Sequence, residues 1–221
     1  TDAEIAQYCQ EYINWMDANN PVCNTTDKDP KRKGIAERLE KIKSDMADIS
    51  DLKLDIKAYY VIDQNAFACA NGSIRVFAGL MELMTDDEII GIIGHEIGHI
   101  VNKDSKESFK KALLTSALKD VAGSTSSTAA ALTDSQLGEL GEALAGAQFS
   151  QKAEYAADDY GYEFLKKSGK DAKSMASALR VIQKLQDDAG ADTSKTKQLF
   201  STHPESGKRA EKLDKKYAKE K

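Results

Sequence analysis

The chain has 221 residues, of which 41% are hydrophobic, and its 31 basic and 36 acidic residues give a formal net charge of −5. This length is enough to bury one sizeable core. No basic segment is interleaved with aromatic residues, so nucleic acid is not an expected partner. No stretch approaches the 18 apolar residues of a membrane-spanning helix, so the chain as given is not expected to cross a membrane.

The first half of the chain predicts a helix followed by a small sheet. Apolar residues at helical spacing predict an amphipathic helix over residues 31–49. Strand-like segments follow at residues 58–62 and 67–69. The Asn-Gly pair at residues 71–72 then predicts a hairpin turn before a strand over residues 73–77.

The next predicted helix carries the most informative motif of the chain. Residues 85–88 form a capping box, which predicts a helix from about residue 85 to beyond residue 100. This helix contains His95, Glu96 and His99 in the order His-Glu-Ile-Gly-His. Histidines four residues apart share a helical face and can bind one Zn²⁺ together. The spacing therefore predicts a zinc-hydrolase site.

Three glycines share the histidine face of this helix: Gly91, Gly94 and Gly98. Each costs about 1 kcal/mol relative to alanine in a helix interior, so the close approach of another element is expected. The alternative is that both histidines are ordinary core residues. They would then need separate hydrogen-bonding partners beside a buried Glu96, so we prefer the metal interpretation.

A third ligand has to come from elsewhere, because Asn102 and Ser105 occupy the later positions of the longer metzincin motif. The best candidate is Glu154, on a helix predicted from an apolar stripe over residues 149–164. Asp158, one turn later, is expected to accept a hydrogen bond from a metal-binding histidine. A solvated helix face is the alternative for this acidic pair. Three other acids compete as the ligand: Glu139, Glu142 and Glu163.

The C-terminal part is expected to be helical. Apolar spacing predicts an amphipathic helix over residues 171–188, and the alternating charges of residues 208–221 are typical of a solvated helix face. Pro204 suits the first position of a helix, so His203 should lie at a helix start. His203 is either a functional residue or a surface histidine. Arg209 either braces the site or is exposed.

Three segments in this order, residues 95–99, 154–158 and 201–209, resemble the gluzincin metallopeptidase family of HtpX, Oma and the CAAX prenyl endopeptidase. The sheet region before the motif resembles the same family, and the similarity covers about residues 55–215. Within this family, residues 135–142 and 148–151 resemble lipoprotein proteases of the Gram-negative outer membrane most closely.

The resemblance implies one Zn²⁺ per chain, bound by His95, His99 and Glu154. It implies that Glu96 is the general base that takes a proton from the attacking water, and that His203 donates to the tetrahedral oxyanion. Asp158 and Arg209 would support the ligands. Asn65 either contacts the substrate beside an edge strand or serves only the geometry of a turn.

The expected fold is an α+β, mainly helical single domain over residues 1–221. N-terminal helices in residues 1–50 would pack on a catalytic core of residues 55–215, with a small sheet before the metal-binding helix. Small polar residues between 120 and 135 predict a linker or, alternatively, a mobile flap.

The expected function is zinc-dependent cleavage of peptide bonds in unfolded or damaged cell-envelope proteins. By resemblance the protein would be periplasmic or associated with the outer membrane, through a lipid anchor on a removed N-terminal segment. The alternative is an inactive or latent chaperone or binding module on the same scaffold. In an exported protein, Cys9 is expected to pair with Cys69, although Cys9 with Cys23 stays open.

Overall fold

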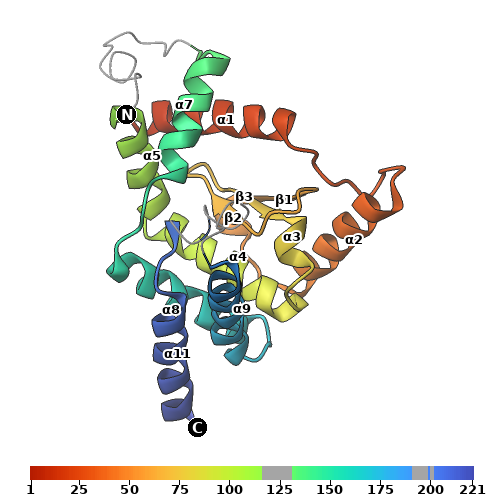
Figure 1. Ribbon diagram of the computed structural model, residues 1–221, viewed down its shortest axis with the longest axis vertical. Coiled ribbons are helices and arrows are strands. Elements are labelled where there is room, and N and C mark those ends of the chain that lie inside the picture. The colour runs from red at the N-terminus through yellow and green to blue at the C-terminus, as the bar shows by residue number, and fades with distance from the viewer. Residues whose placement is uncertain (116–130, 191–198, 200–201) are drawn as a thin grey trace.

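The computed structural model describes residues 1–115, 131–190, 199 and 202–221. Helices surround a small sheet (Figure 1), so the predicted α+β, mainly helical fold is confirmed. The α-helices are α1 (Asp2–Asn19), α2 (Pro30–Asp45), α3 (Ala78–Met81), α4 (Asp86–Val101), α5 (Asp104–Thr115), α7 (Asp134–Ala145), α8 (Gln151–Lys167), α9 (Lys173–Ala189) and α11 (Ser206–Glu220). A 3-10 turn spans Ser50–Leu52, and the strands are β1 (Asp55–Tyr59), β2 (Ala66–Ala68) and β3 (Ser73–Phe77).

The three strands pair in the order β1-β3-β2, with β1 parallel and β2 antiparallel to β3. The predicted hairpin is confirmed, and its turn needs glycine because Gly72 has a φ of +91°. The first strand was predicted over residues 58–62 but spans Asp55–Tyr59, so the strand is confirmed and its predicted bounds were wrong. The strand ends at Tyr59 because the chain turns there, with the Val61 amide donating to the Tyr59 carbonyl at 2.8 Å.

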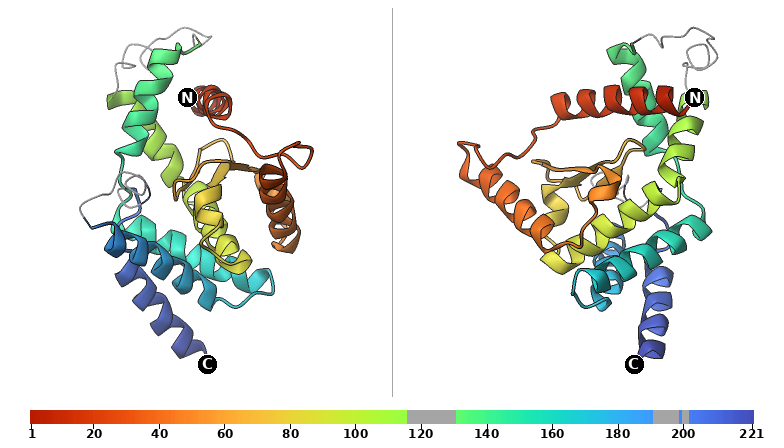
Figure 2. Two further views of the ribbon diagram at one scale, coloured as in Figure 1. Left: turned by 45° about the vertical axis from the view of Figure 1, so that its right-hand side comes forward. Right: turned by 180° about the vertical axis from the view of Figure 1, so that it is seen from behind.

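The sheet lies between α1 on one side and α4 on the other (Figure 2). Helices α8, α9 and α11 lie beyond α4. Two hydrophobic clusters result. The first joins the sheet, α2, α4, α8, α9 and α11, whereas the second joins α1, α5, α7 and Cys69 at the end of β2. We call them the main cluster and the N-terminal cluster.

Helices α4 and α8 pack closely at the glycines that the sequence placed on the histidine face. A Cβ atom added at Gly94 would lie 3.0 Å from the Cα of Gly161, and one added at Gly98 would lie 3.0 Å from the Cα of Ala157. Contacts this short are tighter than nine in ten real Cβ contacts, so glycine is the residue that suits this helix spacing. The predicted close approach is therefore the contact with the helix that carries Glu154.

Helix α1 is fastened to the sheet by a buried ion-pair network. Arg75 on β3 is fully buried, and its Nε donates to Asp17 of α1 at 2.8 Å. Its Nη2 donates to Asp55 at 2.9 Å, and the Tyr59 hydroxyl donates to Asp17 at 2.6 Å. A buried guanidinium needs such carboxylate partners, so the network fixes the position of α1.

The remaining helix predictions agree with the structure, with shifted ends. The helix predicted over residues 31–49 ends at Asp45, and the one predicted over residues 171–188 runs from Lys173 to Ala189. Most of the segment predicted as a linker or flap, residues 120–135, lies outside the described residues. The division into residues 1–50 and 55–215 stays a prediction.

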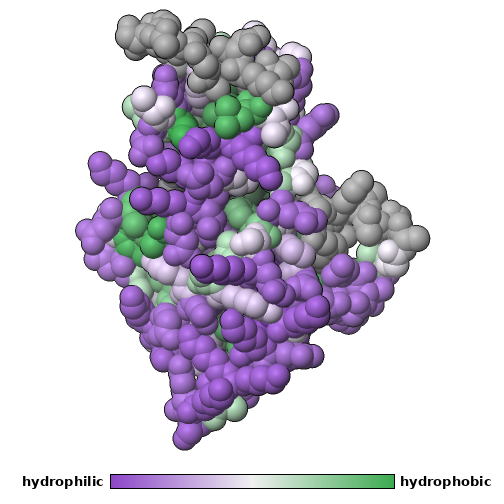
Figure 3. Space-filling model, turned by 90° about the vertical axis from the view of Figure 1, so that its left-hand side faces the viewer, coloured by the Kyte–Doolittle hydropathy of each residue, from purple (hydrophilic) through white to green (hydrophobic). Residues whose placement is uncertain are grey.

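Among the described helices, none combines the length and apolar character that crossing a membrane requires. The face in Figure 3 is mostly hydrophilic, with hydrophobic side chains in separate patches. Within the described ranges of the chain, the large hydrophobic residues that are exposed are Ile62, Leu83, Val101 and Leu114.

Candidate active site

Helix α4 places the two histidines of the motif side by side in the interior. His99 is fully buried and His95 is 3% exposed. Their Nε2 atoms lie 3.0 Å apart, with the rings nearly perpendicular. Glu96, between them in sequence, is also buried. The predicted common face is therefore confirmed, and both imidazoles point their Nε2 atoms to one place.

Helix α8 brings Glu154 to the same place. Its Oε1 lies 3.2 Å from the Nε2 of His99, and its Oε2 lies 3.7 Å from the Nε2 of His95. His203 joins from the segment before α11, with its Nδ1 2.9 Å from Glu154 Oε1 and 3.3 Å from His95 Nε2. The four donor atoms of His95, His99, Glu154 and His203 lie within 4.8 Å of one another.

These separations fit a metal ion. Bonds of about 2.0 to 2.1 Å in a tetrahedron place donor atoms about 3.4 Å apart. The Oε2 of Glu154 accepts no hydrogen bond, although it lies in ion-pair contact with Arg209 Nη1 at 2.5 Å. Two imidazole lone pairs and a carboxylate facing one another repel each other unless a cation lies between them. Nitrogen and carboxylate ligands are a set that Zn²⁺ accepts.

A carboxylate fixes the orientation of each histidine ring. The Nδ1 of His95 lies 2.9 Å from Asp158, as the sequence predicted, and the Nδ1 of His99 lies 3.0 Å from Asp104. Each ring therefore donates from Nδ1 and turns the lone pair of Nε2 to the site. Asp104 was missed by the sequence analysis. Its signal was an acid five residues after His99, at the start of the next helix.

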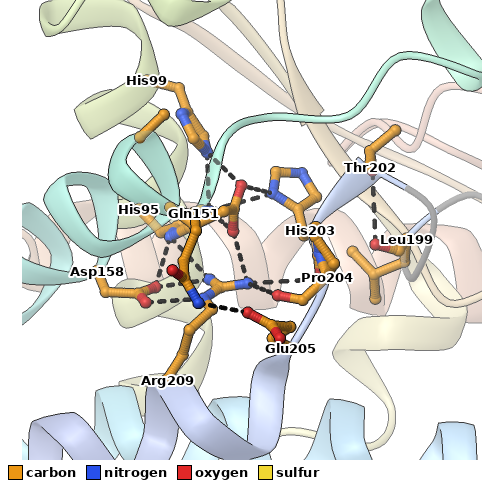
Figure 4. A network of polar contacts seen from close by, with 12 residues as sticks. His95, His99, Gln151, Asp158, Leu199, Thr202, His203, Pro204, Glu205 and Arg209 are labelled. Carbon is orange, nitrogen blue, oxygen red and sulfur yellow. Dashed lines mark hydrogen bonds and ion pairs between the residues drawn. The ribbon is translucent and has the colours of Figure 1, made fainter.

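Arg209 is buried beside the clustered residues and is not exposed (Figure 4). Its Nε and Nη2 donate to the two oxygens of Asp158 at 2.7 and 2.6 Å. Its Nη1 donates to the Pro204 carbonyl at 3.3 Å, which ties α11 to the segment of His203. Arg209 thus braces Asp158, Glu154 and the His203 segment together. The surface alternative for His203 is also wrong, since that residue is 5% exposed.

The predicted helix start at Pro204 was wrong. Helix α11 begins at Ser206, and Glu205 before it has a φ of 62°. The side chain of Gln151, at the start of α8, donates to Glu205 at 2.6 Å. The chain thus turns before the helix rather than at Pro204, and this turn brings His203 close to His95, His99 and Glu154 (Figure 4).

The protonation states follow from burial and charge. Burial lowers the pKa of His95 below its usual value of 6.5. Burial also acts to lower the pKa of His99, but Asp104 and Glu154 outweigh it and raise that pKa to about 9. Burial acts to raise the pKa of Glu154, but His203 and His99 hold it well below its usual value of 4.5. An ionised carboxylate and a neutral imidazole are the forms that bind a metal, and a cation would compete with the proton on His99.

A cleft opens beside His95, His99 and Glu154, lined by Glu96, His203 and Asn65 among others. Asn65 is 4% exposed and immediately precedes β2. Its carbonyl accepts a hydrogen bond from the Phe77 amide at 3.0 Å, so its backbone is fixed by the sheet. The residue predicted to contact substrate therefore lies at the cleft.

Phe149 was predicted as part of the apolar stripe of the helix that carries Glu154, but it lies outside that helix. It lies just before α8, and its ring stacks on His99 with centroids 4.0 Å apart. Its ring centroid is 5.3 Å from that of His203. Phe149 therefore covers two of the four clustered residues with an apolar surface, which strengthens electrostatic interactions beneath it.

A model of peptidase family M48 matches residues 34–217. The chain belongs to peptidase family M48. It is therefore a metalloendopeptidase, as the motif and its resemblance to known families predicted. The match includes all four residues of the cluster, His95, His99, Glu154 and His203.

Individual relatives agree with this assignment. Metalloprotease LoiP of Escherichia coli (strain K12) is 35% identical over 212 residues, which cover 96% of this chain and 79% of LoiP. Metalloprotease YcaL of the same strain is 32% identical over the same shares of both chains. The mitochondrial metalloendopeptidase OMA1 of Bos taurus is 28% identical over 215 residues, which cover 92% of this chain and 40% of OMA1.

Proposed function

We propose that this chain is a zinc-dependent endopeptidase in which His95, His99 and Glu154 hold the metal and Glu96 is the general base. The observation that carries the proposal is that two imidazoles and a carboxylate converge beside a buried Glu96. A structural zinc site has no use for a buried acid next to its ligands, whereas a catalytic site needs a general base there. When bound, zinc would polarise the scissile carbonyl and lower the pKa of water.

The other steps of the proposed reaction depend on side chains of the protein. Glu96 takes the proton of the attacking water and passes it to the leaving amine. The Nε2 of His203 lies 3.6 Å from Glu96 Oε1, so the two side chains face the same reacting groups. In this role His203 donates to the oxyanion that forms on the substrate. Asp158 and Arg209 keep His95 and Glu154 in position.

The substrate backbone is proposed to add to β2. Strand β2 pairs with β3 on one side, and in the described part of the chain no strand pairs with its other side. Its residues Ala66, Phe67 and Ala68 line the cavity beside Glu96. An extended polypeptide that paired with this edge would bind through main-chain hydrogen bonds, largely independently of its sequence. Unfolded segments would therefore be the preferred substrates.

The proposed substrates are unfolded or damaged proteins of the cell envelope, and the proposed location is the periplasm or the outer membrane surface. The support is the resemblance of residues 135–142 and 148–151 to outer-membrane lipoprotein proteases. A lipid anchor on a removed N-terminal segment belongs to the same proposal. The test is fractionation of the full-length protein in its own host, with cytoplasmic recovery contradicting it.

The catalytic proposal is tested by Glu96→Gln. This variant should retain one zinc ion per chain but lose about 10²- to 10⁴-fold in casein cleavage, because only the proton acceptor is removed. Glu88→Gln is a matched control, since Glu88 is a buried acid two turns earlier on α4 that hydrogen-bonds to Ser177 outside the site. Unchanged cleavage by Glu96→Gln, or a wild type without metal, would refute the proposal.

A second candidate is a latent form in which His203 closes the site as a fourth ligand. The short distances from His203 Nδ1 to Glu154 and His95 favour it, because a fourth protein ligand leaves no position for water. In this form the protein would bind polypeptides without cleaving them until His203 moves away.

Substitution of His203 by alanine separates the two candidates. An oxyanion donor predicts a loss of about 10²- to 10³-fold in kcat with unchanged zinc affinity. A closing ligand predicts weaker zinc binding together with a rise in cleavage of the same substrate. The two quantities are measured by chelator competition and by casein cleavage.

A further inference from the structure

The charges of the chain are divided unevenly between its C-terminal helix and the rest. Residues 206–221, which form α11 and the last residue, contain seven basic and three acidic residues. This segment carries a formal charge of +4, whereas the remaining 205 residues carry −9. Helix α11 also projects from the body, with its C-terminal end away from the sheet (Figures 1 and 2). A basic segment on an otherwise acidic chain is typical of a contact with an anionic partner.

Four lysines of α11 share the face that is turned to solvent. At 100° per residue, they fall within an arc of about 60° and form a row about 16 Å long. The opposite face is buried against α8 and α9. We call these four exposed residues the lysine row: Lys208, Lys212, Lys215 and Lys219.

The alternation of charge along the sequence becomes a separation of charge in the structure. Asp214 forms an ion pair with Arg180 on α9. The pKa of Arg180 is raised by Asp214 and, to a smaller extent, by Glu211. Glu220 accepts a hydrogen bond from Lys166 on α8 at 3.1 Å. The acids of α11 thus interact with cations of the neighbouring helices, and the outer face of α11 is left with positive charge.

The lysine row has few partners of its own. Lys208 pairs with Glu205 at 2.6 Å, and the Nζ of Lys212 lies 3.8 Å from the centroid of the Tyr155 ring. Within the described ranges, the other two lysines of the row take part in no ion pair.

The row also has a cost for the helix itself. Lysines three and four residues apart repel each other and weaken a helix. The helix dipole favours cations at the C-terminal end, but it accounts only for Lys219, which lies in the last turn. An anionic partner along the row would relieve this repulsion.

We propose that the lysine row binds the surface of an anionic phospholipid bilayer. The inference depends neither on the metal nor on Glu96. A planar array of phosphate groups attracts a line of lysines without requiring a complementary shape, and each lysine near such a surface strengthens binding about 5-fold.

Other anionic partners suit this face less well. The cores of protein interfaces are depleted in lysine and enriched in aromatic residues, whereas α11 adds no apolar side chain larger than Ala218 to its outer face. Phosphate groups of nucleic acids are bound preferentially by arginine, and the row contains none.

Co-sedimentation of the 221-residue chain with vesicles tests the proposal. The chain should bind vesicles of phosphatidylcholine with about one third phosphatidylglycerol but not vesicles of phosphatidylcholine alone, and binding should fall as salt rises from about 0.05 to 0.5 M. The combined variant Lys212→Gln, Lys215→Gln and Lys219→Gln should bind about 100-fold more weakly, because three contributions are removed.

The matched control replaces Lys28, Lys31 and Lys33 by glutamine. These exposed lysines lie at the start of α2 and just before it, so the control has the same net charge as the α11 variant. It should bind the anionic vesicles as the wild type does.

The proposal is overturned if the two triple variants bind equally, if neutral vesicles bind as strongly as anionic ones, or if the chain binds double-stranded DNA but no vesicles. Glu96→Gln should bind vesicles like the wild type. Loss of cleavage in that variant therefore tests the proposed endopeptidase function separately from the lysine row.

Discussion

At the scale of single residues, the site depends on acids that do not themselves reach the metal position. Asp158 from α8 and Asp104 from α5 hold the outer nitrogens of His95 and His99. Each hydrogen bond fixes a tautomer and the direction of the ring. Because the two acids come from different helices, the orientation of the His95 ring depends on how α8 packs against α4, and that of the His99 ring depends on how α5 packs against α4.

Asp104→Asn is therefore expected to weaken zinc binding about 10- to 100-fold, because the amide holds the His99 ring less firmly and lowers its basicity. The measurement is chelator competition at constant pH. The control is Asp159→Asn, which changes an acid beside Asp158 that pairs with Lys216 at the surface. Equal affinities for Asp104→Asn and wild type would show that the hydrogen bond does not contribute.

The sequence alone was enough to predict the residues that lie at helical spacing from one another. His95, Glu96 and His99 follow from helical periodicity, and Glu154 with Asp158 follows from the same rule applied to a second helix. Asp104 and Arg209 could not be placed by periodicity, because their contacts depend on how α5 and α11 pack against the other helices.

At the scale of elements, the contact of α4 with α8 determines where Glu154 lies relative to His95 and His99, the proposed metal ligands. A Cβ atom added at Gly161 would lie 2.8 Å from the Gly91 carbonyl and 3.1 Å from the His95 amide. The helices could accept it only by moving apart, which would carry Glu154 away from the histidines. The sequence predicted a close approach to α4, but the partner glycine on α8 gave no periodic signal.

Gly161→Ala should lower the free energy of unfolding by about 1 to 3 kcal/mol, as expected for overpacking. It should also weaken zinc binding. Gly34→Ala is the matched control, since Gly34 lies within α2 with nothing within 4 Å of an added Cβ. That substitution should stabilise the protein by about 0.5 to 1 kcal/mol in denaturant unfolding. Destabilisation of equal size by both variants would contradict the argument.

The link of α1 to the sheet makes a prediction about pH. Burial acts to raise the pKa of Asp17, but Arg75 and Tyr59 hold it below its usual value of 3.8. A carboxyl whose pKa is lowered by folding stabilises the protein above its unfolded pKa, and this contribution is lost as the pH falls through the folded value. Asp17→Asn should therefore cost about 2 kcal/mol at pH 7 and progressively less below about pH 4.

Denaturant unfolding of wild type and Asp17→Asn at pH 7 and pH 3 measures this difference. A gap between the two proteins that stayed constant or grew on acidification would contradict the ion pair. The same network explains why the position of α1 could not be predicted, because Asp17 and Arg75 are 58 residues apart and no local pattern relates them.

At the scale of the whole molecule, the distribution of the cysteines between the two hydrophobic clusters bears on the predicted pairing. All three are buried free thiols in this structure. Cys9 and Cys69 belong to the N-terminal cluster, where burial and the neighbouring Cys9 thiol raise the pKa of Cys69, whereas Cys23 belongs to the main cluster. Proximity therefore favours Cys9 with Cys69 over Cys9 with Cys23.

Incubation with oxidised glutathione should join Cys9 to Cys69 and leave Cys23 free, as peptide mapping by mass spectrometry would show. Closure of a loop of this length is expected to stabilise the protein by about 4 kcal/mol through the unfolded state. Cys23→Ser should retain this stabilisation and Cys9→Ser should lose it. A Cys9–Cys23 link in the mapped peptides would contradict the prediction.

The cavity and the metal ligands are supported by two different hydrophobic clusters. Tyr12, Phe109 and Cys69 of the N-terminal cluster form part of the cavity wall, while α4 and α8 pack within the main cluster. Substitutions in the first group can therefore reshape what the enzyme accepts and leave its hydrolytic apparatus intact. Because of this separation, substrate preference can change, in evolution or by engineering, without any change in the residues proposed to carry out hydrolysis.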